Sequence, residues 1–342
     1  MSTPLWIREA EVASLVDMGE AIEALESGLL VEARGEARNM IKTHVGWEGA
    51  TLHAIGAAFP SAGFSGTKTW SHTKGGASPL VILFDSATGA LCAVIEAFVL
   101  GQLRTGAASG VATRWLAAEG ADELAIIGTG KQALAQVAAV AAVRPLRRVR
   151  VYGRDPRRRE ELVRRVGDEL GLSARSEESV ADAVRDAPII TTVTRATEPF
   201  LFAREVARGA HVNAVGAIVP AAAEVAPDLM ARAGRIAADS VPQARELSRE
   251  LRTALGTDEA GWARVQPLSA LVAARKPRPA DEDLTLFKSL GTGIADLSLG
   301  MEVLHRAREH GLGLPLAAPQ RATPRLRPRR VKEGVHGGDE RI

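Results

Sequence analysis

From residue 123 onward, short runs of apolar residues alternate with longer stretches of helical character. The apolar runs predict strands over 123–127, 148–152, 189–193, 211–215, 235–238 and, leading into a turn, 284–291. Residues 131–143 and 156–170 lie between the early runs and predict helices. Strands separated by helices are typical of a parallel sheet covered on both faces, so this part of the chain predicts an α/β fold.

The chain before residue 123 has a different pattern. Apolar residues between Trp6 and Gly35 recur about every 3.6 positions and predict one helix that Gly35 ends. The other elements predicted are short strands and loops over 39–69, a hairpin of 80–84 and 91–95 about a turn at 85–89, and helices over 103–118 and 294–310.

A glycine turn follows the strand at 124–127 directly. Gly128 allows the tight turn, and Gly130 lets a pyrophosphate approach the backbone. Ala133 is small enough for close packing of the next helix, whose N-terminal N–H groups can bind phosphates. An ordinary glycine turn is the alternative, but the second strand at 148–152 stands where a dinucleotide motif requires it. The turn therefore predicts a dinucleotide site.

Ligands of parallel sheets lie beyond the carboxyl ends of the strands. Four residues close to those ends are placed by the pattern on this functional edge: Thr192, Thr194, Gly216 and Asp239.

Composition suits a globular protein, with 46% hydrophobic and 25% charged residues. No apolar run approaches the roughly 20 residues of a membrane span, and the first residues lack the pattern of a secretory signal. Cys92 is the one cysteine, which excludes an intrachain disulfide and predicts a cytoplasmic location. Its small and apolar neighbours predict a buried side chain rather than a nucleophile.

Positive charge is concentrated at the C-terminus. Residues 319–342 contain seven Lys and Arg against three Asp and Glu, whereas the whole chain has a net charge of +2. The remainder is slightly acidic, so the folded part gives no case for nucleic-acid binding. We expect residues 319–342 to form a disordered basic tail.

Six motifs together resemble the ornithine cyclodeaminase/mu-crystallin family, over nearly all of residues 5–315. They are GTK at 66–68, LRTGAAS at 103–109, GTGKQA at 128–133, TRATEP at 194–199, VNAVG at 212–216 and FKSLG at 287–291. The resemblance implies a Rossmann dinucleotide-binding domain inserted into an α+β substrate-binding and dimerisation domain. By this likeness residues 118–286 form the first, residues 1–117 with 287–318 form the second, and the protein is a homodimer.

The resemblance also implies a site for an α-carboxylate. Lys68 and Arg104 match the family's carboxylate-binding residues, and Arg suits a bidentate grip while Lys acts as a point charge. A third cation usually precedes them, and Arg38 and Lys42 are the two candidates. His53 matches a position close to the substrate and is a candidate proton donor, with a structural, hydrogen-bonded histidine as the alternative.

One position departs from the pattern of the cyclodeaminases, which carry an Asp shortly after the VNAVG motif. The corresponding residue here is Ile218, which can neither attract an ammonium group nor accept its proton. This departure disfavours ornithine cyclisation and favours a reductase whose substrate has an apolar or differently polar tail.

The cofactor-binding residues implied by the resemblance lie in the glycine turn and at the strand ends. They are Gly128, Thr129, Gly130, Lys131, Gln132, Gly153, Arg154, Thr192, Thr194, Val215, Gly216, Ser289 and Gly291. By the same resemblance Thr194, Val215 and Gly216 are expected near the nicotinamide.

The end of the second strand bears on the choice of cofactor. NAD enzymes usually place a carboxylate there, about 20 residues after the glycines, for the ribose 2′-hydroxyl. Gly153 and Arg154 occupy this position, which predicts a preference for NADP(H); Asp155 keeps NAD(H) as the alternative. We expect Arg158 and Arg159 on a solvated helix face.

The sequence thus predicts an NAD(P)H-dependent reductase of an imino acid or cyclic ketimine, or an amino-acid dehydrogenase in reverse. The alternatives are a cyclodeaminase that recycles bound NAD and a dinucleotide-binding protein without catalysis. Neither metal-ligand spacing nor a Gly-x-Ser-x-Gly elbow occurs, so no metal site, nucleic-acid partner or membrane partner is expected.

Overall fold

The computed structural model describes residues 3–326, and its middle part forms an eight-stranded sheet in the order β11-β10-β9-β12-β13-β16-β14-β15. All neighbouring strands in it are parallel. The strands are β9 (Glu123–Ile127), β10 (Arg148–Tyr152), β11 (Ser173–Ser176), β12 (Ile189–Thr192), β13 (Ala210–Ala214), β14 (Arg235–Ala238), β15 (Val265–Pro267) and β16 (Leu284–Lys288). The predicted parallel sheet is confirmed, with two further short edge strands, β11 and β15.

Helices accompany this sheet along the chain. They are α4 (Ala133–Ala141), α5 (Pro156–Leu170), α6 (Val180–Val184), α7 (Pro227–Arg232), α8 (Val241–Leu247), α9 (Arg249–Leu255), α10 (Glu259–Trp262) and α11 (Leu268–Ala274), with a 3-10 turn η2 (Ala203–Glu205). Apart from the edge strands β11 and β15, the strands of this sheet are buried over most of their length, as expected of a parallel sheet with both faces covered.

A nine-stranded sheet is formed by the two ends of the chain, in the order β17-β1-β8-β7-β5-β4-β2, with β3 on β4 and β6 on β5. Its strands are β1 (Leu5–Ile7), β2 (Arg38–Asn39), β3 (Thr43–Trp47), β4 (Ala50–Phe59), β5 (Phe64–Thr73), β6 (Gly76–Ala77), β7 (Leu80–Asp85), β8 (Leu91–Glu96) and β17 (Leu314–Pro315). A 3-10 turn, η1 (Pro60–Ala62), joins β4 to β5. The predicted hairpin of β7 and β8 is confirmed.

The single helix predicted between Trp6 and Gly35 is wrong. The chain forms β1, then α1 (Glu9–Leu15), then α2 (Met18–Ala33). Val16 is extended, and the Asp17 side chain accepts a hydrogen bond from the backbone N–H of Glu20 as an N-cap. The apolar spacing continues across this break, which is why periodicity alone missed it.

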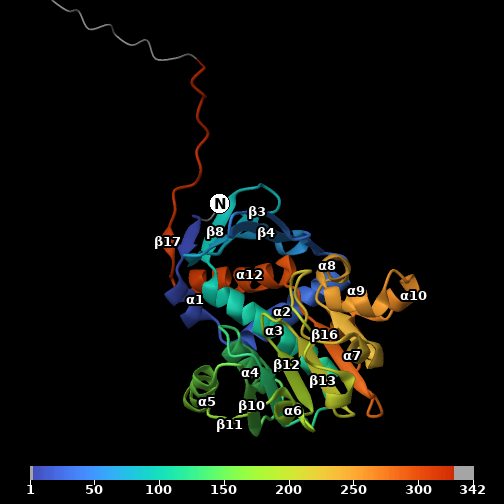
Figure 1. Cartoon of the computed structure of the whole chain (residues 1–342). Helices are drawn as coiled ribbons and strands as arrows, with labels where there is room; N and C mark the ends of the chain where they lie inside the picture. Colours follow the sequence, from blue (N-terminus) through green and yellow to red (C-terminus); the bar gives the residue numbers. More distant parts are fainter. Residues whose placement is uncertain (1–2, 327–342) are drawn as a thin grey trace, which may run out of the picture.

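Three long helices lie between the two sheets (Figure 1): α2, α3 (Phe98–Leu116) and α12 (Gly293–Glu309). α12 packs against the nine-stranded sheet, and α3 packs against α4 and the strands β13 and β16. The predicted close packing of α3 is confirmed, because a Cβ added to Gly110 would lie 2.6 Å from Cδ1 of Ile22. One apolar cluster contains residues of these helices, of the nine-stranded sheet and, from the parallel sheet, Ala237 and Phe287, so the helices pack the two sheets together.

The fold class is confirmed: a parallel α/β unit is inserted between two chain segments that build the other sheet. The boundary expected after residue 286 falls inside β16, which stays paired in the parallel sheet through Lys288. Of the expected tail, residues 319–326 are exposed and form neither helix nor strand, and residues 327–342 lie outside the described part. Among the described helices, none has the length and apolar character needed to cross a bilayer.

Candidate active site

The predicted cofactor residues meet at one edge of the parallel sheet. β9 and β12 are neighbours, but the chain continues from β9 to β10 on one side and from β12 to β13 on the other. Such a switch point opens a crevice beyond the carboxyl ends of the strands. A Cβ added to Gly128, at the end of β9, would lie 2.5 Å from the carbonyl oxygen of Val193. Glycine therefore lets the two strand ends approach each other here.

The turn after β9 has the open backbone that the predicted dinucleotide site requires. Gly128 has a φ of 123°, which favours glycine, and a Cβ added to Gly130 would meet nothing within 4 Å. Ala133 is fully buried at the start of α4, and Oε1 of Gln132 is buried with no hydrogen-bond partner among the described residues. The Lys131 ammonium lies 5.1 Å from the centroid of the Phe98 ring. An open glycine backbone beside an unpaired buried acceptor fits a bound cofactor.

The end of β10 lies against this turn. A Cβ added to Gly153 would lie 2.7 Å from Cγ2 of Thr129, so glycine is required for the contact. Arg154 is exposed, whereas the carboxylate of Asp155 accepts hydrogen bonds from the backbone N–H groups of Arg157 and Arg158 and caps α5. The Asp155 carboxylate thus already has donors.

The expectation that Arg159 lies on a solvated helix face is wrong, although that for Arg158 holds. Arg159 is buried, and it donates hydrogen bonds to the carbonyl oxygen of Gly153, to Oγ of Ser176 and to the carboxylate of Glu178. Its long side chain folds back under the end of β10 because these acceptors satisfy the guanidinium there. Arg159 therefore stabilises the backbone turn at Gly153.

Thr192, Thr194, Val215 and Gly216 lie where β12 and β13 end. Thr192 and Val215 are buried, and the Thr192 hydroxyl donates a hydrogen bond to Glu224. Any effect of the Thr192 hydroxyl on a cofactor is thus indirect.

The loop after β16 leads into α12, the helix that packs on the nine-stranded sheet. The carboxylate of Asp239 accepts hydrogen bonds from the hydroxyl of Ser289 and from the backbone N–H groups of Leu290 and Gly291. The Gln243 side chain donates to the carbonyl oxygen of Gly291. These bonds fix the loop, and burial raises the pKa of Asp239 despite the donors around it.

Lys68 and Arg104 are brought together by a residue that the sequence analysis missed. Oδ1 of Asp296 lies 2.6 Å from Nζ of Lys68 and 3.0 Å from Nε of Arg104. A Cβ added to Gly291 would lie 2.7 Å from Nη1 of Arg104, so the cation touches the loop after β16. Burial and the charge of Arg104 lower the pKa of Lys68 to about 8, although Asp296 opposes the shift. We name Lys68, Arg104 and Asp296 the clamp.

Lys42, rather than Arg38, adds its charge to the clamp. Burial and the Arg104 charge lower the pKa of Lys42, and the charge of Lys42 in turn acts on Lys68. Arg38 is exposed on β2, where it pairs with Ala58. The structure therefore favours Lys42 as the third cation.

His53 lies beside the clamp on β4. Its ring stacks on Trp70 with centroids 4.7 Å apart, and Nζ of Lys68 lies 5.1 Å from the centroid of Trp70. Nε2 of His53 is 2.7 Å from the Thr51 hydroxyl, and Nδ1 is buried without a partner among the described residues. Burial and the charge of Lys42 lower the pKa of His53 to about 4, so the ring is neutral at pH 7.

Asp296 and Glu224 could have been recognised from the sequence as buried carboxylates. Each is a lone carboxylate within an apolar run, and each is fully buried. Such a residue needs a partner, because an unpaired buried charge is costly. The sequence could not name those partners.

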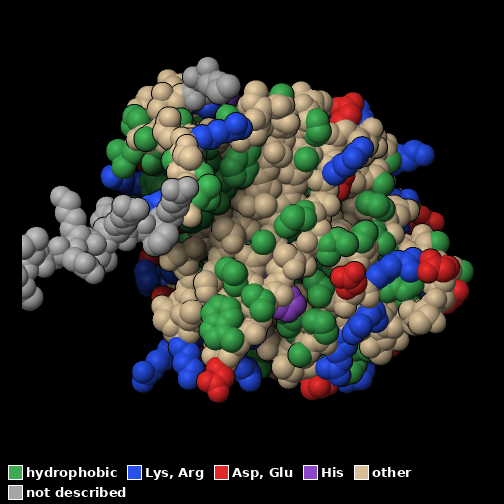
Figure 2. Space-filling view, turned by 90° about the horizontal axis from the view of Figure 1, so that it is seen from above, with side chains coloured by type: hydrophobic (Ala, Val, Ile, Leu, Met, Phe, Trp, Pro, Cys, Tyr) green, Lys and Arg blue, Asp and Glu red, His purple; other side chains and the backbone are tan. Residues whose placement is uncertain are grey.

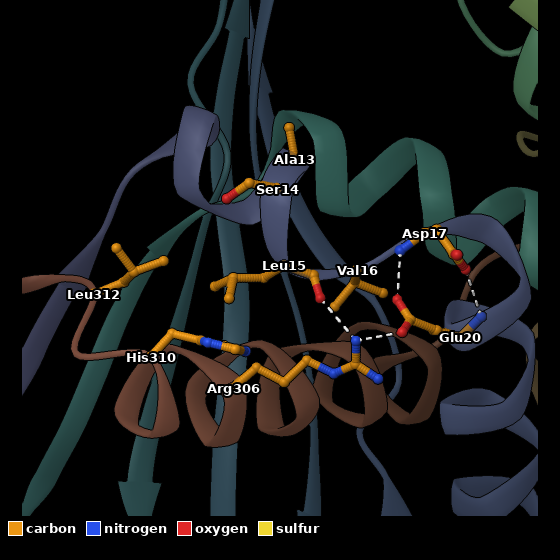
Figure 3. Close-up of a pocket in the computed structure, with 9 residues that line it drawn as sticks. All are labelled: Ala13, Ser14, Leu15, Val16, Asp17, Glu20, Arg306, His310 and Leu312. Atoms are coloured by element: carbon orange, nitrogen blue, oxygen red, sulfur yellow. Dashed lines mark hydrogen bonds and ion pairs between the residues drawn. The ribbon is translucent and has the colours of Figure 1, made fainter.

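A cavity of about 470 Å³ lies away from these residues, between α1, the start of α2 and the end of α12 (Figure 3). The arginine that lines it is already paired: Arg306 contacts Glu20 and Glu302 and donates a hydrogen bond to the carbonyl oxygen of Leu15. Arg306 is therefore not free to bind an anionic ligand there. In residues 3–326, His, Cys, Asp and Glu side chains form no cluster of three able to hold a metal.

Known proteins resemble this chain over most of its length. A Delta(1)-pyrroline-2-carboxylate reductase of Bacillus cereus is 33% identical over 236 residues, which cover 68% of this chain and 72% of that protein. The structure of Thermococcus litoralis Delta(1)-pyrroline-2-carboxylate reductase in complex with NADH and L-proline matches with a TM-score of 0.85 and 27% identity, covering 91% of this chain and 100% of that one. An archaeal alanine dehydrogenase dimer with bound NAD matches with a TM-score of 0.85 and 28% identity, covering 92% and 99% of the two chains.

Together with the switch point and its glycine turn, these similarities define the class of protein as an NAD(P)-dependent oxidoreductase. More narrowly, the chain belongs to the ornithine cyclodeaminase/mu-crystallin family, whose model matches residues 5–311. The resemblance stated from the six motifs is confirmed.

Proposed function

We propose that this protein is an NAD(P)H-dependent reductase of an imino acid or cyclic ketimine carboxylate, or an amino-acid dehydrogenase in reverse. The observation that carries the proposal is the position of the clamp. Arg104 touches Gly291 in the loop after β16, and that loop lies at the edge of the parallel sheet with the cofactor turn. An acid group bound by the clamp is thereby held near the cofactor edge.

The charges of the clamp suit an anionic substrate. Lys68, Arg104 and Lys42 are cations, and Asp296 is the carboxylate that pairs with the first two within residues 3–326. The excess positive charge attracts an α-carboxylate, which Arg104 can grip in bidentate fashion. Binding the acid group at fixed cations orients the neighbouring C=N bond.

The chemical step needs a hydride and, at the nitrogen, a proton. Bound NAD(P)H supplies the hydride. His53 was the predicted proton donor, but a pKa of about 4 leaves it neutral at pH 7 and a weak source of protons. We therefore favour a bound water as donor, with His53 and Trp70 forming a wall of the substrate site.

Cyclic imines are the substrates we place first. The Bacillus cereus and Thermococcus litoralis relatives are named as reductases of Delta(1)-pyrroline-2-carboxylate. Ile218 is exposed in the loop after β13, where the resemblance implies that a cyclodeaminase carries an Asp. An apolar residue there suits a ring of methylene groups better than an ammonium tail.

NADP(H) is the cofactor we expect to be preferred, with NAD(H) as the alternative. The exposed Arg154 follows Gly153 directly, and the Asp155 carboxylate is engaged in capping α5. An arginine in place of a free carboxylate suits a 2′-phosphate. The similar solved structures of the reductase and the alanine dehydrogenase contain NADH and NAD, so the preference for NADP(H) needs its own test.

A homodimer is supported by an exposed apolar face of β3 and β4. Val45 and Trp47 alternate on β3, Leu52 pairs opposite Val45, and the three side chains are 58%, 53% and 45% exposed. In Figure 2, which looks onto this side of the molecule, charged side chains lie mostly at the rim. An apolar strand face of this kind suits a second copy of the chain, and the archaeal alanine dehydrogenase is described as a dimer.

The decisive experiment is a cofactor-oxidation screen of cyclic and linear imino acids with NADPH and NADH. With five- and six-membered cyclic imines we expect nearly all of the reduced cofactor to be oxidised, seen as loss of its absorbance at about 340 nm. Ammonia released from ornithine without net change in absorbance would instead establish a cyclodeaminase. Tight NADPH binding without turnover on any substrate would establish a binding protein.

A further inference from the structure

Two loops meet at the predicted nicotinamide end of the cofactor site. Thr194 follows β12, and Gly216 follows the neighbouring strand β13. A Cβ added to Gly216 would lie 2.2 Å from the carbonyl oxygen of Thr194. Because the loops touch so closely, a small shift of one against the other changes the surface they present together.

The carboxylate of Glu224 accepts hydrogen bonds from both loops. Oε1 accepts a hydrogen bond from the backbone N–H of Thr194 at 2.5 Å. Oε2 accepts from the N–H groups of Gly216 at 2.7 Å and Ala217 at 3.2 Å. The hydroxyl of Thr192 is a further donor to Oε2, at 3.0 Å. Glu224 is fully buried, so these bonds replace its hydration.

Glu250 and Lys288 hold Glu224 in place. Oε1 of Glu250 accepts hydrogen bonds from the backbone N–H groups of Glu224, at 2.8 Å, and Val225, at 2.9 Å. Oε2 of Glu250 lies 2.6 Å from Nζ of Lys288, and both side chains are fully buried. The contact with Lys288, at the end of β16, thus fixes the Glu250 carboxylate, which in turn binds the backbone of Glu224.

We propose that Glu224 is a positioning residue for hydride transfer, which fixes the Thr194 and Gly216 loops as one surface for the nicotinamide. The proposal rests on the proposed function, since it assigns a task at the nicotinamide end of NAD(P)H. Glu224 acts through the two loops and does not itself contact the cofactor.

Glutamine is the informative replacement because it keeps the shape and changes the acceptors. A carboxylate accepts on both oxygens, whereas an amide presents an oxygen on one side and N–H donors on the other. In Glu224→Gln the amide nitrogen faces the N–H of either Thr194 or Gly216. Two donors then oppose each other in a buried place, and one loop is released.

The experiment compares two ligands by direct titration. NADPH reaches both ends of the cofactor site, and 2′-phospho-ADP-ribose lacks the nicotinamide. In Glu224→Gln we expect the Kd for NADPH to rise about tenfold or more. The Kd for 2′-phospho-ADP-ribose should stay within about twofold of the parent value. Single-turnover hydride transfer should slow about tenfold while the KM for the imine changes little.

Glu198→Gln is the matched control, because Glu198 lies in the same loop region but its carboxylate is exposed and pairs with Arg249. It should behave as the parent in both titrations. Equal NADPH affinity and equal hydride-transfer rates in Glu224→Gln and the parent would overturn the proposal.

Loss of 2′-phospho-ADP-ribose binding in Glu224→Gln would indicate general damage to the fold, and Thr192→Val then decides. That variant keeps the carboxylate and removes one donor, so NADPH binding alone should weaken about threefold. No change there overturns the proposal. The two titrations need no turnover, so a protein that reduces no imine still tests Glu224, and the proposed function fails separately.

Discussion

The carboxylate Oδ1 of Asp296 lies 2.6 Å from the ammonium Nζ of Lys68, and both side chains are buried where α12 packs on β5. A buried lysine stays charged only when an anion compensates its lost hydration. Asp296 does this and also contacts Arg104, which is still partly exposed. The pair therefore holds a cation ready for an acid group on the substrate.

Lys68→Met should lower kcat/KM for the imine about 100-fold or more, chiefly through a higher KM, because a fixed cation for the carboxylate is lost. Asp296 keeps Arg104 as partner, so the variant should still fold. Steady-state kinetics at saturating NADPH measure the effect, with the exposed Lys74→Met as control. A kcat/KM within a few-fold of the parent would remove Lys68 from the clamp, and Arg104→Ala is the parallel test.

Asp296→Asn should move the alkaline limb of the pH profile to lower pH. The pKa of Lys68 is about 8, and the Asp296 charge raises it against burial and Arg104. Binding an acid group needs the protonated lysine, so kcat/KM should fall as pH rises through this pKa, and earlier without Asp296. The imine's own titration is common to both enzymes, and Asp281→Asn on the surface is the control. An alkaline limb at the same pH in the parent and in Asp296→Asn would contradict the prediction.

The parts of this fold that short-range pattern controls were predictable. The turn after β9 was predictable because Gly128 has a positive φ, a local requirement, and because the spacing of Gly128 and Gly130 after an apolar run is visible in the sequence. The break at Val16 was missed because apolar periodicity persists across it. The signal that could have shown it was the Asp17 and Glu20 capping pair.

The partners within the site were not predictable because they are set by tertiary contacts. Asp296 meets Lys68 across 228 positions, and nothing local in either segment specifies the other. The choice between Arg38 and Lys42 depends on how the β2 segment pairs with β4, which one strand's sequence leaves undetermined. Burial of Arg159 likewise depends on acceptors from β11 and the loop after it.

His53→Gln should leave the pH dependence of kcat unchanged above about pH 6, with kcat lowered less than about tenfold. The reason is that a pKa of about 4 keeps His53 neutral in this range, so glutamine replaces a wall residue that stacks on Trp70. The profile of kcat against pH for both enzymes is the measurement. A vanished titration limb or a 100-fold loss of kcat, on the order of a removed general acid, would instead restore His53 as proton donor.

Trp47→Glu should turn the proposed dimer into a monomer. Trp47 lies beside Val45 on the exposed face of β3, and a carboxylate placed in an apolar interface would lose its hydration. Light scattering after size-exclusion chromatography should give twice the 36.1 kDa chain mass for the parent and one chain mass for the variant. Leu326→Glu changes a more exposed apolar residue outside this face and should stay dimeric. A parent that elutes as a monomer would contradict the proposal.

Arg154→Ala should raise the KM for NADPH about tenfold or more and leave the KM for NADH nearly unchanged, because only NADPH carries the 2′-phosphate. Arg157→Ala is the matched control: Arg157 is also exposed, but it lies two residues beyond the Asp155 cap, in the first turn of α5. The KM of each variant for both cofactors, measured with one imine, separates the two arginines. A parent KM for NADH equal to or below that for NADPH would overturn the preference. Asp155 would then be the residue to test next, since both cap bonds fall on its Oδ1 and the half-exposed carboxylate keeps Oδ2 for a ribose hydroxyl.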